Sequence, residues 1–168
     1  VVKRVQGDAF ANVRSNGLIA INLKDQDELL SVRMVKESDQ VIIATKKGQS
    51  IRFLVSDIRV MGRTAGGVKG ITLKKDDLAI ALSVVDEEES PNSEFLVLTE
   101  NGYGKKTPLE EYKIQGRGGS GIKTLNVTEK TGQLIGARVV DETDIEIMAM
   151  SQRSQVIRTN VASVSSLG

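Results

Sequence analysis

The sequence predicts an all-β protein built from repeated small sheets, and three observations support this fold class. Glycine-arginine segments recur at an offset of 54, because residues 62–70 (GRTAGGVKG) align with residues 116–124 (GRGGSGIKT). The apolar segments are short and dominated by Val, Ile and Leu, which favour strands. Turn signals separate them, as at Asn101-Gly102. A period of about fifty residues is typical of solenoids, propellers and related arrays.

The repeat continues to the end of the sequence. Thr45 and Thr99 share the offset of 54, and a further step of 52 leads from Thr99 to Ser151 and from Lys106 to Arg158. We therefore expect one domain whose repeats cover about residues 1–29, 30–79, 80–133 and 134–168. The first and last repeats look incomplete, so the chain is expected to start inside a repeat.

Each full repeat is predicted to hold four strands, like a propeller blade. Hairpins are expected where two strand-like segments flank a short polar turn, at residues 41–45 with 50–54, 94–99 with 103–107, and 145–151 with 155–159. Further strands are expected at residues 29–35, 68–73, 78–85, 122–127 and 134–140. Residues 107–112 are expected to form one helical turn, with Thr107 as its cap and Pro108 at its first position.

Composition excludes several classes of chemistry. The 168 residues contain neither Cys nor His, which rules out disulfides, a histidine general base, a Cys-His nucleophile and Cys/His zinc sites. No apolar run approaches the ~18 residues of a membrane span, and no secretory signal opens the chain, so a cytoplasmic location is expected. The net charge is only +1, so any nucleic-acid surface must arise from charges sorted by face.

The glycine-rich segment 116–124 also matches two phosphate-binding motifs, and both interpretations fail. Gly116, Gly118 and Gly121 give the spacing G-x-G-x-x-G, but a dinucleotide site needs a helix directly after it. Residues 122–127 alternate apolar and polar side chains, which is the period of a strand. A P-loop needs Lys directly after the last glycine, whereas Ile122 lies between Gly121 and Lys123.

The combination of blade-like repeats and glycine-arginine loops resembles the C-terminal domain of DNA gyrase A. The resemblance rests on residues 61–71 (MGRTAGGVKGI), 101–107 (NGYGKKT) and 12–23 (NVRSNGLIAINL), and it covers nearly the whole chain. It implies a β-pinwheel, a propeller-like disc of six blades in which neighbouring blades exchange a strand. Residues 115–121 (QGRGGSG) resemble the family's Q-R-R-G-G-K-G box in a degenerate, later copy, with Gly116 and Ser120 in place of basic residues.

The resemblance implies a non-catalytic module that binds and wraps double-stranded DNA, without cofactor or metal. Its partners would be the rest of DNA gyrase A and the whole of DNA gyrase B, in an ATP-dependent enzyme of the nucleoid that introduces negative supercoils. The equivalent domain of topoisomerase IV and a propeller-like scaffold for protein partners remain as alternatives. An enzyme is disfavoured, because Tyr103 and Tyr112 occupy repeat positions unlike a catalytic setting.

Basic side chains at the recurring loops and hairpin tips form the predicted DNA surface. Arginines beside glycine can reach a phosphate together with backbone N–H groups. No recognition helix is expected, so the binding of DNA should not depend on its base sequence. The sequence leaves open whether the tip lysines contact DNA or only aid solubility. The acidic stretch 86–93 is expected to point away from DNA. The predicted DNA-binding residues are Arg14, Lys46, Lys47, Arg52, Arg63, Lys69, Lys105, Lys106, Arg117, Lys123, Arg153 and Arg158.

Overall fold

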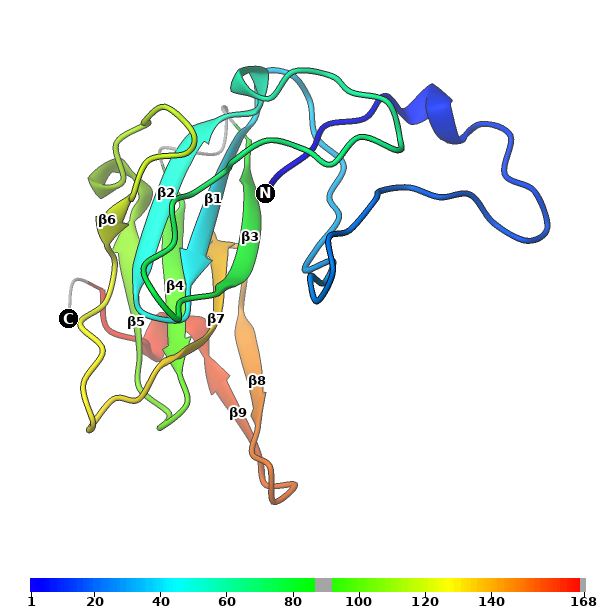
Figure 1. Ribbon diagram of the computed structural model, residues 1–168. Helices are drawn as coiled ribbons and strands as arrows, with labels where there is room; N and C mark the ends of the chain where they lie inside the picture. Colours follow the sequence, from blue (N-terminus) through cyan, green and yellow to red (C-terminus); the bar gives the residue numbers. More distant parts are fainter. Residues whose placement is uncertain (87–91, 167–168) are drawn as a thin grey trace.

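The computed structural model describes residues 1–86 and 92–166, and this part of the chain contains strands and short 3-10 turns but no α-helix. The all-β prediction is therefore confirmed. Figure 1 shows the two larger sheets side by side, with the N-terminal segment extending away from them. Within the described residues, no helix is long and apolar enough to cross a membrane. Most of the acidic stretch 86–93 lies outside the described residues.

Three antiparallel hairpins form the framework, as predicted. They are β1 (Gln40–Thr45) with β2 (Gln49–Leu54), β4 (Glu94–Thr99) with β5 (Gly104–Pro108), and β8 (Glu146–Met150) with β9 (Val156–Asn160). Their registers correspond, since Gln40 faces Leu54, Glu94 faces Pro108 and Glu146 faces Asn160. The hairpins are thus three copies of one unit.

Two further strands extend the hairpins on the side of their first strand. β3 (Ala79–Val85) pairs with β1, and β7 (Leu134–Val140) pairs with β4. Both pairings shift register at the same place, at Thr45 in the first sheet and at Thr99 in the second. A shared irregularity of this kind indicates that the repeat extends to backbone detail.

The last strand of the first sheet comes from the following repeat. β6 (Ile122–Lys123) pairs with β2, so the sheet order is β3-β1-β2-β6, while the second sheet has the order β5-β4-β7. Earlier in the chain, Val68 forms an antiparallel bridge with Val2 at the corresponding position. Neighbouring repeats therefore exchange a strand, as the resemblance implies. The short 3-10 turns are η1 (Gly7–Phe10), η2 (Val55–Asp57), η4 (Leu109–Glu111) and η5 (Val161–Ser163).

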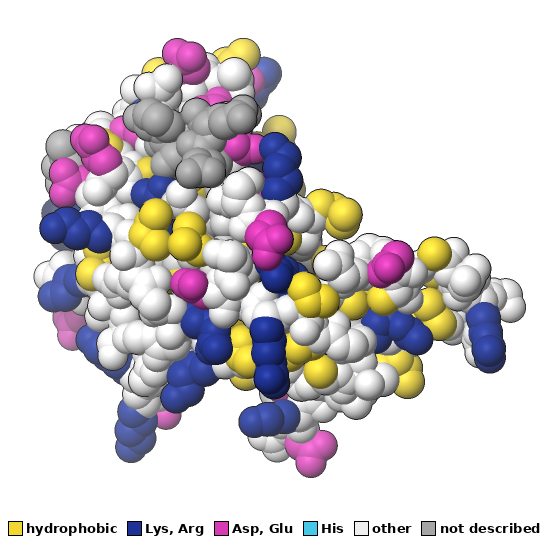
Figure 2. All heavy atoms as spheres, turned by 90° about the horizontal axis from the view of Figure 1, so that it is seen from above, with side chains coloured by type: hydrophobic (Ala, Val, Ile, Leu, Met, Phe, Trp, Pro, Cys, Tyr) yellow, Lys and Arg dark blue, Asp and Glu magenta, His cyan; other side chains and the backbone are white. Residues whose placement is uncertain are grey.

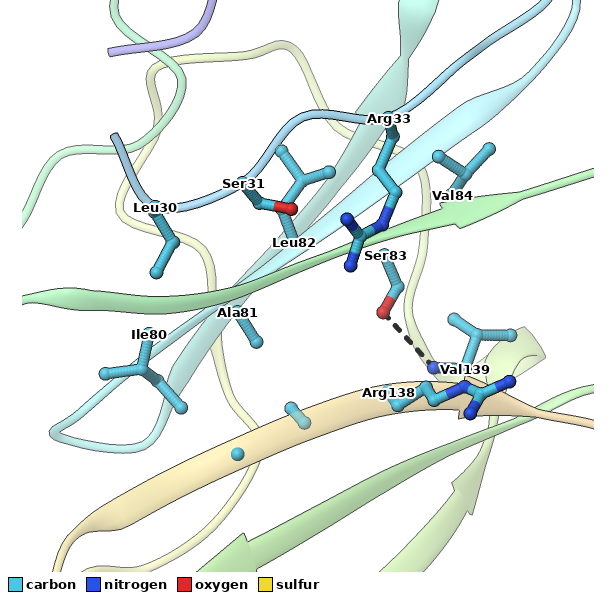
Figure 3. A pocket seen from close by; sticks show the side chains of 12 residues that line it. Leu30, Ser31, Arg33, Ile80, Ala81, Leu82, Ser83, Val84, Arg138 and Val139 are labelled. Carbon is cyan, nitrogen blue, oxygen red and sulfur yellow. Dashed lines mark hydrogen bonds between the residues drawn. The ribbon is translucent and has the colours of Figure 1, made fainter. Parts of the chain in front are cut away.

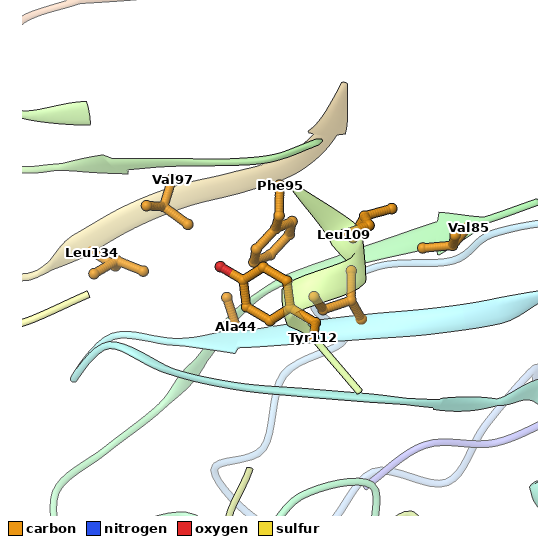
Figure 4. Close-up of a cluster of buried hydrophobic side chains, with 8 residues drawn as sticks. Ala44, Val85, Phe95, Val97, Leu109, Tyr112 and Leu134 are labelled. Carbon is orange, nitrogen blue, oxygen red and sulfur yellow. The ribbon is translucent and has the colours of Figure 1, made fainter. Parts of the chain in front are cut away.

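The main core lies between the first two sheets. Phe95 and Tyr112 meet edge to face, with ring centroids 5.4 Å apart, and the Tyr112 hydroxyl hydrogen-bonds the buried Thr124 hydroxyl. Every residue of β1 is buried, because Ile42 faces this core while Val41 packs in a second one. Burial on both faces explains the continuous apolar run. The main core comprises Ile42, Ala44, Val85, Phe95, Val97, Leu109, Tyr112 and Leu134 (Figure 4).

Some predicted strands are shorter or missing. Residues 29–35 form no strand. The equivalent strands β3 and β7 each pair with a hairpin, whereas no described strand pairs with residues 29–35. Of residues 68–73 only Val68 forms a bridge, and Thr72 instead donates its N–H to the Gly119 carbonyl of the next loop. β6 ends at Lys123, because Thr124 then donates to the Gly48 carbonyl at the hairpin tip.

The predicted helical turn at residues 107–112 exists, but its cap was predicted wrongly. The 3-10 turn η4 begins after Pro108, which occupies the capping position. Neither Pro108 nor Thr107 provides a capping hydrogen bond, since the Thr107 hydroxyl is buried without a hydrogen-bond partner.

Glycine is required where the exchanged strand reaches the preceding sheet. Gly67 and Gly121 have φ of +83° and +69°. A Cβ at Gly67 would lie 2.6 Å from the Val2 carbonyl oxygen, and one at Gly121 would overlap the Ser50 carbonyl oxygen. Side chains other than glycine rarely adopt such φ values, and backbone cannot withdraw easily. These glycines therefore permit the strand exchange.

We predict that Gly121→Ala lowers the free energy of unfolding by more than ~2 kcal/mol, since left-handed strain and a backbone overlap add together. Gly116→Ala in the same loop is the matched control, because nothing lies within 4 Å of its Cβ position and its φ is not positive. Urea unfolding measures both variants. Equal stability of the two would contradict the role assigned to Gly121.

Candidate nucleic-acid interface

The glycine-arginine loops of successive repeats lie directly against each other. The Gly118 N–H donates to the Gly70 carbonyl at 2.7 Å, and the Thr72 N–H donates to the Gly119 carbonyl at 2.8 Å. The Thr72 hydroxyl also donates to the Gly118 carbonyl, at 2.7 Å. Residues 116–121 therefore lie against the segment that continues from residues 62–67, which places the two loops along one edge of the molecule.

The two loop arginines are anchored to the backbone of the preceding repeat. Arg63 Nη1 donates to the Ile19 carbonyl at 2.9 Å, and Arg117 Nη1 donates to the Lys69 carbonyl at 3.2 Å. Arg117 Nε also donates to the Asp57 carbonyl, at 2.9 Å. Both residues are half-buried. A guanidinium group has five N–H donors in a fixed plane, so each arginine is oriented by some donors and keeps others for a ligand.

Lys3 extends this edge toward the N-terminus, and the sequence analysis missed it. Its Nζ donates to the Ala20 carbonyl at 3.1 Å and to the Arg63 carbonyl. Burial and, second, the positive charge of Arg63 lower the pKa of Lys3. Val2 and Arg4 occupy the positions of Ser50 and Arg52, because Val2 pairs with Val68 as Ser50 pairs with Ile122, and Arg4 pairs with Val60 as Arg52 pairs with Ile114. Aligning these residues in the sequence is the signal that could have indicated that residues 1–4 pair with the exchanged segment.

Exposed lysines alternate with the anchored arginines along the edge. Lys69 and Lys123 are both exposed, and each lies one residue after the start of an exchanged segment. We call Lys3, Arg63, Lys69, Arg117 and Lys123 the cationic row. Arg14 lies in the first of the three equivalent loops, exposed, in a turn closed by the Gly17 N–H and the Arg14 carbonyl.

Basic side chains gather on part of the surface although the total charge is nearly neutral. Figure 2 shows many Lys and Arg side chains in the lower half of the visible face, with some Asp and Glu side chains among them. Such clustering gives a local potential that a net charge of +1 does not reveal.

Comparison with known proteins identifies the family of this arrangement. A sequence model described as DNA gyrase C-terminal domain, beta-propeller, matches residues 1–36, 39–86, 93–141 and 146–168. The chain is 41% identical over all 168 residues to DNA gyrase A of Staphylococcus epidermidis, and 40% identical to that of Staphylococcus aureus. It covers 18% and 19% of those relatives' lengths.

The chain belongs to the DNA gyrase C-terminal domain family. A solved DNA gyrase A C-terminal domain matches with a TM-score of 0.78 and 34% identity, over 91% of this chain and 51% of that one. A topoisomerase IV C-terminal domain matches with a TM-score of 0.85 and 23% identity, over 95% of this chain and 50% of that one. The predicted β-pinwheel class and the predicted resemblance are both confirmed.

The hairpin tips of this gyrase-family chain carry a second set of lysines. Lys47 Nζ donates to the Lys75 carbonyl at 2.8 Å, and the Lys47 N–H donates to the buried Asp77 carboxylate at 2.9 Å. The turn 74–77 thus joins Lys74 and Lys75, which the sequence analysis did not select, to Lys46 and Lys47. Lys105 is half-buried beside the next tip, and Arg153 is exposed at the third.

Arg52 was predicted to bind DNA, and the structure contradicts this. Its side chain is buried, and it donates from Nε to Gln40 Oε1 at 2.7 Å and from Nη1 to the Leu109 carbonyl at 2.6 Å. A longer bond of 3.3 Å joins Nη1 to the Tyr112 carbonyl. Burial lowers the pKa of Arg52. This arginine connects the first sheet to the turn η4 of the next repeat.

Lys106, at the equivalent position in the second hairpin, is likewise not free to bind DNA. Its Nζ lies 2.7 Å from Glu94 Oε2, and only 12% of its side chain is exposed. Burial acts to raise the pKa of Glu94, but hydrogen bonds from Lys106 and Ser166 and the charge of Lys106 lower it overall. Arg158 pairs with Glu146 in the third hairpin, yet its side chain is 68% exposed.

We predict that Arg52→Ala lowers the free energy of unfolding by ~3 kcal/mol, because it removes a buried side chain and leaves Gln40 Oε1 and the Tyr112 carbonyl without its donors. The equivalent Arg158→Ala should cost less than ~1 kcal/mol, as for an exposed ion pair. Chemical denaturation of both variants gives the comparison. If Arg158→Ala were the more damaging change, the assignment of Arg52 to the core would be wrong.

Proposed function

We propose that this chain binds and wraps double-stranded DNA as part of the C-terminal domain of a DNA gyrase A protein. The observation that carries the proposal is the stacking of two glycine-arginine loops, whose arginines are oriented by carbonyls of the preceding repeat. The chain spans about a fifth of the length of its curated relatives. The roles of the rest of gyrase A and of gyrase B in ATP-dependent negative supercoiling are therefore part of the proposal.

The geometry suits the phosphate backbone rather than the bases. The cationic row lies on loops and short exchanged segments, and no α-helix occurs among residues 1–86 and 92–166 to enter a major groove. Anchored guanidinium groups and exposed ammonium groups are typical donors to phosphate oxygens. Binding should therefore depend strongly on salt and weakly on sequence.

Repetition accounts for wrapping. Bending a short site costs of order 1–6 kcal/mol, which one phosphate contact cannot supply. We call each glycine-arginine loop, together with the segment of the preceding repeat that anchors its arginine, a cationic corner. The hydrogen bonds between repeats hold successive cationic corners in a fixed order, so several phosphate contacts can act together on one duplex. Each corner is formed by two repeats, because Arg117 of one contacts the Lys69 carbonyl of the other. The chain performs no catalysis in this proposal and contributes to supercoiling only by holding curved DNA.

The identities favour gyrase over topoisomerase IV as the parent. The full chain is 41% identical to a gyrase A protein, whereas the topoisomerase IV match at 23% identity establishes the fold alone. Location with the nucleoid in the cytoplasm follows from this proposal, since that is where the DNA substrate lies.

We predict that Arg63→Gln and Arg117→Gln each weaken DNA binding about tenfold and reduce the salt slope by ~0.9 for each phosphate that is no longer neutralised. Arg117→Lys should keep the slope but lose affinity, because lysine lacks the planar fork. Fluorescence anisotropy with a duplex shorter than the persistence length of about 150 bp measures both quantities at several salt concentrations.

Arg138→Gln is the charge-matched control, since Arg138 lies on β7, away from the loops. It should leave DNA affinity nearly unchanged. The proposal fails if wild-type protein does not bind duplex DNA at low salt, or if the control loses as much affinity as the loop variants.

A further inference from the structure

A hollow of about 440 Å³ lies between the edge strands β3 and β7. In the first sheet, β3 is at the opposite edge from the exchanged strand β6. The hollow is bounded by residues 30–33, by β3 and by β7, which come from three successive repeats. Figure 3 shows Arg33 and Arg138 with Ser83 between them. The DNA-binding proposal does not use this region, because the cationic row lies with the exchanged segments.

Three of the four polar residues that line the hollow, namely Arg33, Ser83 and Arg138, occupy the same position in successive repeats. Ser83 faces Ile42 in β1, and Arg138 faces Leu96 in β4, in matching registers. Arg33 aligns with Arg138 because the turns after them correspond: the Lys36 N–H donates to Asp39, as the Asp141 N–H donates to Asp144. The repeat therefore brings two arginines and a serine together in one hollow.

The donors that face this hollow exceed the acceptors. Arg33 Nη1 donates to the neighbouring Val32 carbonyl at 2.9 Å, and Arg33 has no ion-pair partner within residues 1–86 and 92–166. Arg138 Nη2 lies 3.2 Å from Asp144 Oδ1, but 73% of its side chain is exposed. Ser83 accepts from the Val139 N–H at 3.3 Å and keeps its hydroxyl proton to donate. None of the twelve lining residues is acidic.

These features suit a small anion with more than one negative charge. Guanidinium groups pair with phosphate through two parallel N–H donors, and two of them match a dianion better than a monoanion. The volume lies within the range of small-molecule sites. Duplex DNA does not fit such a space, because its major groove alone is about 12 Å wide.

We propose that this inner hollow binds a small phosphate-bearing anion between Arg33 and Arg138, with Ser83 as an additional hydrogen-bond donor. The site is separate from the cationic row. Its expected ligand is a free small molecule that carries phosphate groups, and inorganic pyrophosphate is a suitable probe. Binding would connect residues 30–33, which form no strand, to β3 and β7.

Isothermal titration of pyrophosphate into the protein, Arg33→Gln, Arg138→Gln and Arg117→Gln tests the proposal at low ionic strength. Each hollow variant should bind about tenfold more weakly, while Arg117→Gln, which removes the same charge from the DNA-facing loops, should match the wild type. Repeating the titration on protein saturated with duplex DNA should give the same affinity. Arg33→Gln is the more informative variant, because Arg138→Gln also frees Asp144 and could disturb its turn.

Three results would overturn the proposal: no heat of binding at millimolar pyrophosphate, unchanged affinity in Arg33→Gln, or displacement of pyrophosphate by DNA. The last would assign the anion to the DNA surface. The DNA affinity of Arg33→Gln separates the two proposals. Retained DNA affinity together with lost pyrophosphate binding supports the inner site as a separate site. Loss of DNA affinity in this variant would contradict the separation of the hollow from the DNA surface.

Discussion

The hydrogen bonds between consecutive glycine-arginine loops are the constraint on which the rest of this structure depends. The Gly118 N–H reaches the Gly70 carbonyl and the Thr72 N–H reaches the Gly119 carbonyl, so each loop is held by the one before it. Gly118 in this contact has a φ of +84°, and Gly121 in the same loop combines a φ of +69° with a close approach to the Ser50 carbonyl of β2. The glycines are thus conditions for assembling the repeats, and the arginines gain their orientation from the same contact.

The same linkage connects structure to the proposed function. Arg63 and Arg117 use part of their hydrogen-bonding capacity on carbonyls of the preceding repeat, and the rest remains for phosphate. A cationic corner therefore exists only when two repeats are docked. DNA that contacts several corners would in turn hold the repeats together, because a ligand that binds the docked state stabilises it.

The sequence reveals the repeated hairpins, the strand exchange through the family resemblance, and the loop arginines. Those features depend on local patterns, such as apolar segments flanking Gly48 or Asn101-Gly102. The burial of Arg52 and Lys106 could not be predicted from such local patterns. Both look like surface cations at repeated positions, and only tertiary packing reveals that Arg52 meets η4 and that Lys106 meets Glu94. Lys3 was missed because its partners lie 17 and 60 residues away.

Backbone hydrogen exchange at Thr72 and Gly118, with and without duplex DNA, tests the central claim most directly. These two amides donate across the junction between repeats. The account predicts that DNA slows their exchange several-fold, while the Val164 amide, which bonds within the turn η5 to the Val161 carbonyl, is unaffected. Unchanged exchange at Thr72 and Gly118 in DNA-saturated protein would contradict the claim that DNA binds across docked repeats.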